Sequence, residues 1–557
     1  MDQARVLIAI VLSFLVFFAW NFFFVEKQKP VPPKGNTAVV QEDEKENTNQ
    51  EKAPVHKTAE ANPPAAYMTE TPVVSQKTFS RVIRVESPLY SVAINETGAA
   101  FQSFVLKNYK ESTDPKSPDK ELVSPAVSQN MIRLSLVGNS IPGLKDAIFS
   151  AQEAPDTLAV TDMEKELVFT WLSDNGVLIE KRYRFRPESY LIQLTVDIKN
   201  GSDRAIIDKV VLGIESELGD QKKGYTFEGP CALIDGKLEQ IKTKKIKDKN
   251  EYPGKIKWLA IVDRYFMKSL IPLEDTAGVM ALSMDSHAIL DSRFIGPENT
   301  ISPGVQKRYA YEIFFGPKSM QVLKNAGHEL SKAINFGMFD IIAKPLLWFM
   351  NAIYSKVPNY GIAIIILTIL TKVLLWPLGS KSYKSMNEMK RIQPLMAEIR
   401  EKYKDDKKMI NQETMSLYKT YKINPMGGCL PMILQIPVFF ALYRMLYSAI
   451  ELRHAPFFLW INDLSAPDRL FHFSFSIPFM QPPYGIPVLT VIMGATMLLQ
   501  QKMSPPPGDP TQAKMMMLMP IVFTVIFINF SSGLVLYWLT NNLLSIAQQA
   551  YIQKKYA

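Results

Sequence analysis

The side chains with chemical potential in this 557-residue sequence lie where the chain is otherwise apolar. Lys372 falls inside the run from about Gly361 to Leu378, roughly eight residues or about 12 Å from the end at which charges resume. Thr368 precedes it by one helical turn and would share its face. A lysine placed in this way either extends its amine to the membrane surface or puts a cation into a wet groove among helices.

A second polar set lies in the last apolar segment. Tyr537, Asn541, Ser545 and Gln548 are separated by four, four and three residues, which places them on one continuous helix face. Gln435, in another apolar segment, could meet that face. Such a face either forms hydrogen bonds between membrane helices or lines a hydrophilic groove, and the spacing is compatible with both.

The apolar segments lack the groups that several other chemistries need. None carries Asp or Glu in its interior, whereas proton- and cation-coupled transporters usually need carboxylates there. The sequence has no glycine-rich phosphate loop, HExxH, GxSxG or clustered zinc ligands, and its five histidines are scattered. Cys231 and Cys429 are interpreted as unpaired packing residues. We therefore expect no enzyme activity, no cofactor and no metal. A solute transporter and a carbohydrate-binding protein remain the alternatives.

Six apolar segments are candidates to cross a membrane. Val6–Val25 is a run without charge that would span about 30 Å as a helix, and no small-residue cleavage site follows it. Residues 1–25 are therefore predicted to be an uncleaved signal anchor, and the polar residues 26–79 a disordered periplasmic tether. The five further spans are predicted at about Gly361–Leu378, Leu430–Tyr447, Tyr484–Gln501, Met515–Phe530 and Leu534–Ile552.

Residues 80–317 have a different pattern, in which apolar and polar side chains alternate. The alternation in Val177–Arg186 and Tyr190–Ile198, with Asn-Gly turn signals nearby, predicts half-buried antiparallel strands. Further strands are expected at Val279–Met284 and Tyr309–Phe315, so the region is predicted to be a large β-sandwich. Residues 318–356, with apolar side chains spaced as in a helix from Leu323 to Ile353, are predicted to form one interfacial amphipathic helix.

The loops predict the orientation. Residues 380–425 contain eleven Lys and Arg residues and six acidic residues. The basic residues of 451–483, by contrast, are only Arg453 and Arg469. Positive charge accumulates in cytoplasmic loops, so the first loop and both termini are predicted to be cytoplasmic and the sandwich periplasmic. The net charge of +9 fits this arrangement, and we expect no sequence-specific binding of nucleic acid.

The basic loop is predicted to be a helical hairpin that turns at 404–407. Its apolar stripes either pack on each other beneath a solvated basic face, or form a basic, Met-containing surface that meets ribosomes, targeting factors or emerging chains. The basic residues assigned to such contacts are Lys381, Lys384, Lys390 and Arg391. The two stripes are Met386, Met389, Met396, Ile399 and Tyr403, and Ile410, Thr414, Leu417 and Tyr421.

Four segments resemble the YidC/Oxa/Alb family of membrane protein insertases, in its Gram-negative form. They are NPMGGCLPMILQIPVFFALY at 424–443, ELRHAPFFLWINDLSAPD at 451–468, QQKMSPPPGDPTQAKMMMLMP at 500–520 and SSGLVLYWLTNNLLSIAQQ at 531–549. The resemblance is strong over about 350–552. It implies a multi-pass α-helical inner-membrane protein with six spans, of which five form an insertase core over 357–552, and a periplasmic sandwich like that of sugar mutarotases.

The resemblance also implies a function and a site. Family members insert and fold membrane proteins through a hydrophilic groove, alone or with the SecYEG translocon, and they receive ribosomes through the signal recognition pathway. Nascent membrane proteins and membrane lipids are the implied partners. The family's groove cation, usually arginine, falls at Lys372, and its groove contacts fall at Thr368, Gln435 and Trp538. Tyr537 and Asn541 join this set from the polar face described above.

Overall fold

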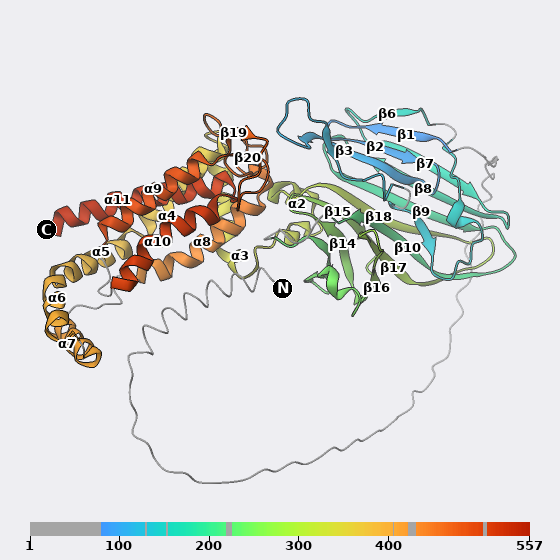
Figure 1. Cartoon of the computed structure of the whole chain (residues 1–557). Helices are drawn as coiled ribbons and strands as arrows, with labels where there is room; N and C mark the ends of the chain where they lie inside the picture. Colours follow the sequence, from blue (N-terminus) through green and yellow to red (C-terminus); the bar gives the residue numbers. More distant parts are fainter. Residues whose placement is uncertain are drawn as a thin grey trace, which may run out of the picture. The chain divides into compact units, whose positions relative to one another are not determined.

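The computed structural model describes residues 80–128, 131–151, 154–218, 226–404, 406–421, 430–504 and 510–556. The signal anchor predicted for 1–25, the tether predicted for 26–79 and Cys429 lie outside the described residues. The described part of the chain contains a β-rich region followed by a helical region (Figure 1).

The β-rich region is built from three sheets, and nearly all neighbouring strands are antiparallel; β1 and β6 are the parallel pair. The largest sheet has the order β12-β11-β14-β15-β18-β9-β8-β7, and the others have the orders β13-β16-β17-β10-β5 and β4-β3-β2-β1-β6. The strand bounds are β1 Val82–Glu86, β2 Tyr90–Asn95, β3 Ala100–Lys110, β4 Asp119–Glu121, β5 Leu134–Leu136, β6 Thr157–Ala159, β7 Lys165–Leu172, β8 Val177–Phe185, β9 Leu191–Asn200, β10 Ile206–Glu217, β11 Gly229–Ile234, β12 Lys237–Gln240, β13 Glu251–Gly254, β14 Ile256–Val262, β15 Phe266–Pro272, β16 Gly278–Met284, β17 Ile289–Ile301 and β18 Gln306–Pro317.

The strands follow from the alternation in the sequence. In β8 every second side chain is buried, and β8 pairs with β9 from Val177 opposite Asn200 to Phe185 opposite Ile192. Because the side-chain period of a strand is two, this register places Val177, Ile179, Tyr183 and Phe185 on one buried face. The strands predicted in these two segments, and those predicted near 279–284 and 309–315, are confirmed. The core between the sheets is rich in aromatic rings, among them Phe101, Phe104 and Phe315.

One inward position of β8 holds a lysine. Lys181 has no exposed side-chain surface, and its Nζ donates to the carbonyl oxygens of Gly98, Ala99 and Ile132 at 3.0, 2.9 and 2.9 Å. Burial lowers the pKa of Lys181 to about 7. All three residues that supply these carbonyls have positive φ, at 69°, 44° and 62°. The two turns are therefore shaped so that their carbonyl groups converge on one ammonium group.

The prediction of a single amphipathic helix within residues 318–356 is wrong. The segment forms α2 (Met320–Ala326), two short 3₁₀ turns (Leu330–Ala333 and Gly337–Phe339) and α3 (Asp340–Tyr354). Gly327 and Gly337 have φ of 78° and 67°, which an α-helix does not accommodate. Apolar residues assigned to one face consequently diverge: Leu323 and Leu330 are buried, whereas Met338 and Ile341 are 87% and 86% exposed.

The helical region follows α3. Its helices are α4 Tyr360–Leu374, α5 Trp376–Arg391, α6 Gln393–Lys402, α7 Lys407–Thr420, α8 Leu430–Ser448, α9 Val488–Met503, α10 Pro510–Phe527 and α11 Ser532–Tyr556. A two-stranded sheet, β19 (Leu470–Phe473) with β20 (Tyr484–Ile486), precedes α9, so the helix predicted from Tyr484 begins four residues later. Over the described residues, none of the helices alone has both the length and the apolarity needed to cross a bilayer. Only α4 and α5 taken together do, and they meet at a 65° bend.

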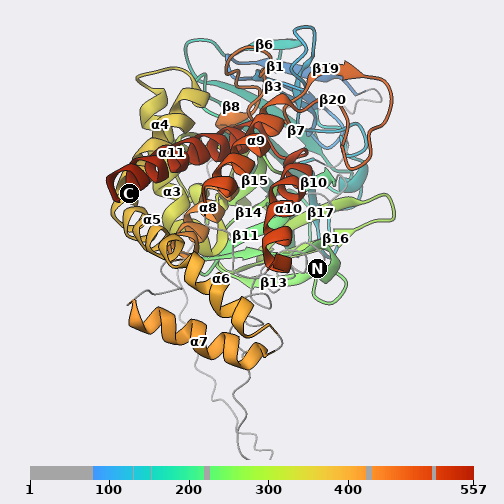
Figure 2. The ribbon, with the colours of Figure 1, turned by 60° about the vertical axis from the view of Figure 1, so that its left-hand side comes forward.

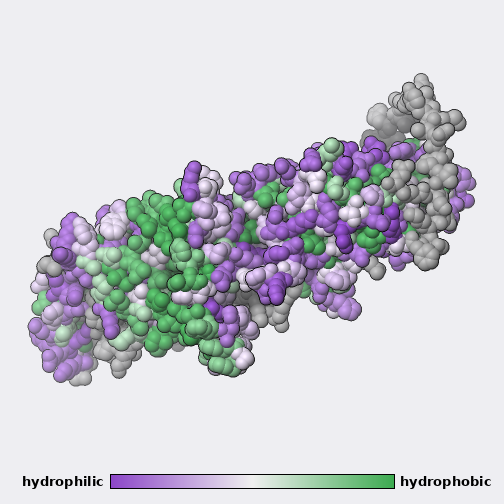
Figure 3. Space-filling model, turned by 90° about the horizontal axis from the view of Figure 1, so that it is seen from above, coloured by the Kyte–Doolittle hydropathy of each residue, from purple (hydrophilic) through white to green (hydrophobic). Residues whose placement is uncertain are grey.

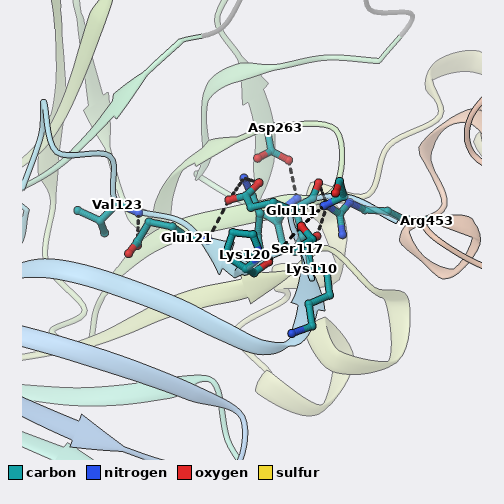
Figure 4. Close-up of polar contacts among 11 residues, drawn as sticks. Lys110, Glu111, Ser117, Lys120, Glu121, Val123, Asp263 and Arg453 are labelled. Carbon is teal, nitrogen blue, oxygen red and sulfur yellow. Dashed lines mark hydrogen bonds and ion pairs between the residues drawn. The ribbon is translucent and has the colours of Figure 1, made fainter. Parts of the chain in front are cut away.

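Two arginines join the β-rich and helical regions. Arg453, in the loop after α8, donates to the carbonyl oxygens of Lys110 and Glu111 at the end of β3, where Lys120 also bonds Glu111 (Figure 4). Arg264, after β14, donates to the Tyr447 carbonyl oxygen at 2.7 Å, and its guanidinium lies 3.7 Å from the Tyr447 ring centroid. Both contacts use planar guanidinium groups that stack and donate at the same time.

Replacing Lys181 by Met should destabilise the sandwich by about 3 kcal/mol or more, since three buried carbonyl groups would lose their donor. Thermal unfolding of the full chain, followed by limited proteolysis within 80–317, would measure the loss. Lys165→Met is the matched control, because Lys165 is exposed on neighbouring β7. Equal stability of the two variants would contradict the bonding role of Lys181.

Candidate functional site

Lys372 lies in the last turn of α4 and reaches across to α11. Its Nζ donates to Ser545 Oγ at 2.7 Å, and Ser545 Oγ in turn donates to the Asn541 carbonyl oxygen at 2.7 Å. Within the described residues no carboxylate lies within ion-pairing distance of Lys372. The ammonium group thus bonds a neutral hydroxyl rather than a carboxylate. The lysine is partly exposed, and an ammonium group has three donors.

Asn541 and Gln435 connect α11 to α8. Gln435 Nε2 donates to Asn541 Oδ1 at 2.9 Å, and the Gln435 side chain also bonds the hydroxyl of buried Tyr537. One turn beyond Ser545, Gln548 Nε2 donates to the Trp376 carbonyl oxygen at 3.1 Å and to Ser380 Oγ at 3.3 Å. The face predicted from the four-four-three spacing therefore meets three different helices, α8, α4 and α5 (Figure 2).

We call Lys372, Gln435, Asn541, Ser545 and Gln548 the polar cluster. Three buried polar atoms of α11 have no hydrogen-bond partner among the described residues: Trp538 Nε1, Gln548 Oε1 and Gln549 Oε1. A buried polar atom without a partner costs free energy, so such atoms are rare unless water or another molecule bonds them. The cluster thus retains unused hydrogen-bonding capacity.

Trp538 packs against three aromatic rings beside the polar cluster. Its ring centroid lies 4.7 Å from that of Phe439, 5.0 Å from that of Phe527 and 6.3 Å from that of Phe523. These rings come from α8 and α10, so α11 also presents an aromatic side chain beside its polar face. The arrangement places an apolar surface directly next to the polar one.

Thr368 does not join the polar cluster. It is 1% exposed, and its hydroxyl donates to the Ile364 carbonyl oxygen within α4 at 2.6 Å. A residue that the sequence did not suggest does join it: the Tyr383 hydroxyl bonds the side chains of Ser545 and Gln500. The sequence did not indicate Tyr383 because residues 380–425 are predicted to form a hairpin outside the spans, whereas α5 runs through this point and packs on α11.

The predicted helical hairpin is present in a modified form. Three helices rather than two cover the segment, because α5 ends at Arg391 and α6 begins at Gln393, with Pro394 in its first turn. Residues 422–425 lie outside the described part. Met389, Met396 and Leu417 pack around Ile392 as the stripes predicted. Tyr418 takes the place predicted for Tyr421, and its hydroxyl lies 3.7 Å from Met396 Sδ. All four basic residues assigned to contacts are exposed on α5: Lys381, Lys384, Lys390 and Arg391.

Comparison with known proteins covers the whole length. A family model described as "60Kd inner membrane protein" matches residues 352–557, and one described as "YidC periplasmic domain" matches residues 82–349. A "Membrane protein insertase YidC" from Syntrophus aciditrophicus is 41% identical over 571 residues, covering 100% of both chains.

Two solved structures are similar at lower identity. One, titled "Active YidC insertase crystal structure with the first transmembrane domain resolved", is 19% identical with a TM-score of 0.37, covering 85% of this chain and 92% of that chain. A galactose mutarotase related enzyme from Lactobacillus acidophilus is 11% identical with a TM-score of 0.30, covering 42% of this chain and 97% of that one. TM-scores this low carry no argument about the fold.

Cysteines introduced at Gln435 and Asn541 should react with a water-soluble maleimide in membrane vesicles, because both positions are partly exposed beside unpaired polar atoms. A cysteine at Thr368 should not react, since that position is buried. Cys429→Ser supplies the background, and Cys231 stays unreactive because burial raises the pKa of its thiol to about 12. Mass spectrometry would count the labels, and an unlabelled 435 and 541 would mean that the cluster is dry.

Proposed function

The chain belongs to the YidC family of membrane protein insertases, and we propose that it inserts nascent membrane proteins into the inner membrane through a hydrated groove centred on Lys372. The observation that carries the proposal is the bond from Lys372 to a neutral hydroxyl, with no carboxylate within reach among the described residues. A charge at membrane depth is costly, about 2.5–3.5 kcal/mol on insertion scales, and is retained where it has a use.

The charge of Lys372 would act on the entering chain. A client segment has to move polar or acidic residues past the apolar interior, and each of them loses hydration on the way. The remaining donors of the Lys372 ammonium group and water in the groove would provide partners part of the way across, which shortens the dehydrated path. Unpaired donors and acceptors such as Trp538 Nε1 and Gln548 Oε1 support a hydrated groove.

Release into lipid needs no separate energy source. Once the apolar side chains of the client reach the bilayer, their transfer from water is favourable and moves the segment sideways. The aromatic surface formed by Phe439, Phe523 and Trp538 lies next to the polar cluster and offers an apolar exit from it. Binding and release are therefore driven by the same difference in solvation, without hydrolysis of a nucleotide.

The proposed topology has six spans with both termini in the cytoplasm and the sandwich in the periplasm. The bend between α4 and α5 and the basic residues of α5 are compatible with a helix that leaves the bilayer on the cytoplasmic side. The helices α6 and α7 would meet ribosomes and the signal recognition pathway there, and SecYEG would be a partner for some clients. We assign no sugar chemistry to the sandwich and no solute transport to the helices.

Lys372→Arg should keep insertion near the normal rate, whereas Lys372→Ala and Lys372→Glu should lower it at least about tenfold for clients with acidic translocated tails. The reason is that arginine keeps the positive charge and the other two residues remove or reverse it. Protease protection of a radiolabelled client in proteoliposomes would measure the rate.

Lys502→Ala is the matched control for Lys372, since it removes one base from the exposed end of α9. Clients with uncharged tails form the second control, because their insertion should depend much less on Lys372. Normal insertion of acidic-tailed clients by Lys372→Ala would reject the charge mechanism.

Replacing residues 393–420 by a short Gly-Ser linker should impair insertion while the protein still accumulates in the membrane. The deletion removes α6 and α7 but spares α5, whose Ser380 and Tyr383 bond α11. Ribosome co-sedimentation and client insertion would be measured together. Unchanged values of both would reduce α6 and α7 to a spacer.

A further inference from the structure

The loop between α8 and α9 exposes large apolar side chains. Leu459, Phe471, Phe475 and Phe479 are 86%, 68%, 62% and 81% exposed. Phe471 lies within β19, Phe475 and Phe479 lie between β19 and β20, and the rings of Phe473 and Phe475 stack at 5.1 Å. We call residues 470–486, which contain this two-stranded sheet, the aromatic hairpin.

The backbone of the aromatic hairpin is held rigidly from its inner side. Buried Arg469 donates to the Pro483 carbonyl oxygen at 2.9 Å and to the Ile528 carbonyl oxygen at 2.8 Å. Asn529 Nδ2 donates to the Phe479 carbonyl oxygen at 2.7 Å, and Asn529 Oδ1 accepts from Gln481 N at 2.8 Å. Polar groups thus face the end of α10 while the phenylalanine side chains point outward, so their exposure is not a result of loose structure.

Backbone strain accompanies this exposure. Leu459, Phe471 and Phe479 have φ of 59°, 53° and 65°, a region that bulky residues rarely adopt and that glycine adopts without penalty. These side chains therefore neither fill the core nor suit their own backbone. Strained residues of this kind persist where an interaction outside the local fold requires their side chains.

The residues around the aromatic hairpin indicate that the interaction partner of these side chains is a lipid surface. From Leu470 to Gln501 the sequence contains no Asp, Glu, Lys or Arg. The adjoining helices α9 and α10 have 16 and 18 residues. These lengths correspond to about 24 and 27 Å, which is less than the ~30 Å hydrocarbon core of a bilayer. Apolar side chains also cover much of the helical region in one view (Figure 3), and Ile521 and Val522 of α10 are among those exposed.

We propose that the aromatic hairpin and Leu459 insert into the interface of the outer leaflet and extend the apolar surface of the short helices α9 and α10. Aromatic and large aliphatic side chains are typical of segments that insert at the boundary between lipid headgroups and acyl chains. Arg469 and Asn529 fix the hairpin to the end of α10, so its depth in the lipid sets the depth of these helices. The inference rests on the proposed membrane function, because it requires the helices to span the bilayer.

Lipid-depth quenching in nanodiscs tests the proposal on the full chain. The fluorophore NBD would be attached to Phe475→Cys in the Cys429→Ser background, and lipids with doxyl groups at shallow or deep acyl positions would be compared. We expect the shallow doxyl group to quench this probe at least about twofold more than the deep one, as for an interfacial side chain. Phe479→Cys should behave in the same way.

Two matched probes separate the possible failures. Ile521→Cys on α10 should be quenched best by the deep doxyl group, and Ile207→Cys on β10 of the sandwich should not be quenched; both positions are exposed. Quenching at 521 without quenching at 475 and 479 would overturn the hairpin inference alone. Absence of quenching at 521 would instead refute the membrane-spanning helices of the proposed function. A blue-shifted but unquenched probe at 475 would indicate a protein partner and would also overturn the inference.

Discussion

A single ammonium group, that of Lys372, connects α4 to α11 through its bond to the Ser545 hydroxyl. Lys372 and Lys181 both bond only neutral acceptors among the described residues. The two lysines differ in bonding and exposure. Lys181 uses three donors on three carbonyl oxygens and has no exposed surface, whereas Lys372 bonds Ser545 and is partly exposed. The bonds of Lys181 are all made within the sandwich, whereas under the proposed function the remaining donors of Lys372 would bond an entering chain.

Helix α11 supplies the hydroxyl group that Lys372 bonds. One of its faces carries Asn541, Ser545 and Gln548, each bonded to a different helix, and Trp538 beside that face packs on aromatic rings. Helix α11 therefore has a polar surface and an aromatic surface that lie close to each other. Under the proposed function, that proximity lets a client exchange water for lipid without crossing a long dehydrated path.

The ends of the helical region are fixed by arginines with carbonyl partners. Arg264 connects the sandwich to the last turn of α8, Arg453 connects it to the loop after α8, and Arg469 holds the aromatic hairpin against the end of α10. Each guanidinium bonds backbone oxygens rather than carboxylates, so the contact depends on the geometry of the chain more than on a charged partner. Arg469, which the sequence offered only as a base in a loop, is a buried structural residue.

The sequence by itself determined the class of each region, because hydrophobic period and charge placement are local properties. The two-residue alternation defined β8 and β9, and the four-four-three spacing defined the polar face of α11. Only the tertiary structure decided the partners: that Lys372 bonds Ser545, that Thr368 bonds its own helix, and that Tyr383 joins the cluster from α5. It also divided the segment 318–356, where Gly327 and Gly337 adopt positive φ that a helical pattern of apolar residues does not reveal. Spacing fixes which side chains share a face, whereas the element that the face meets depends on contacts between residues far apart in the chain.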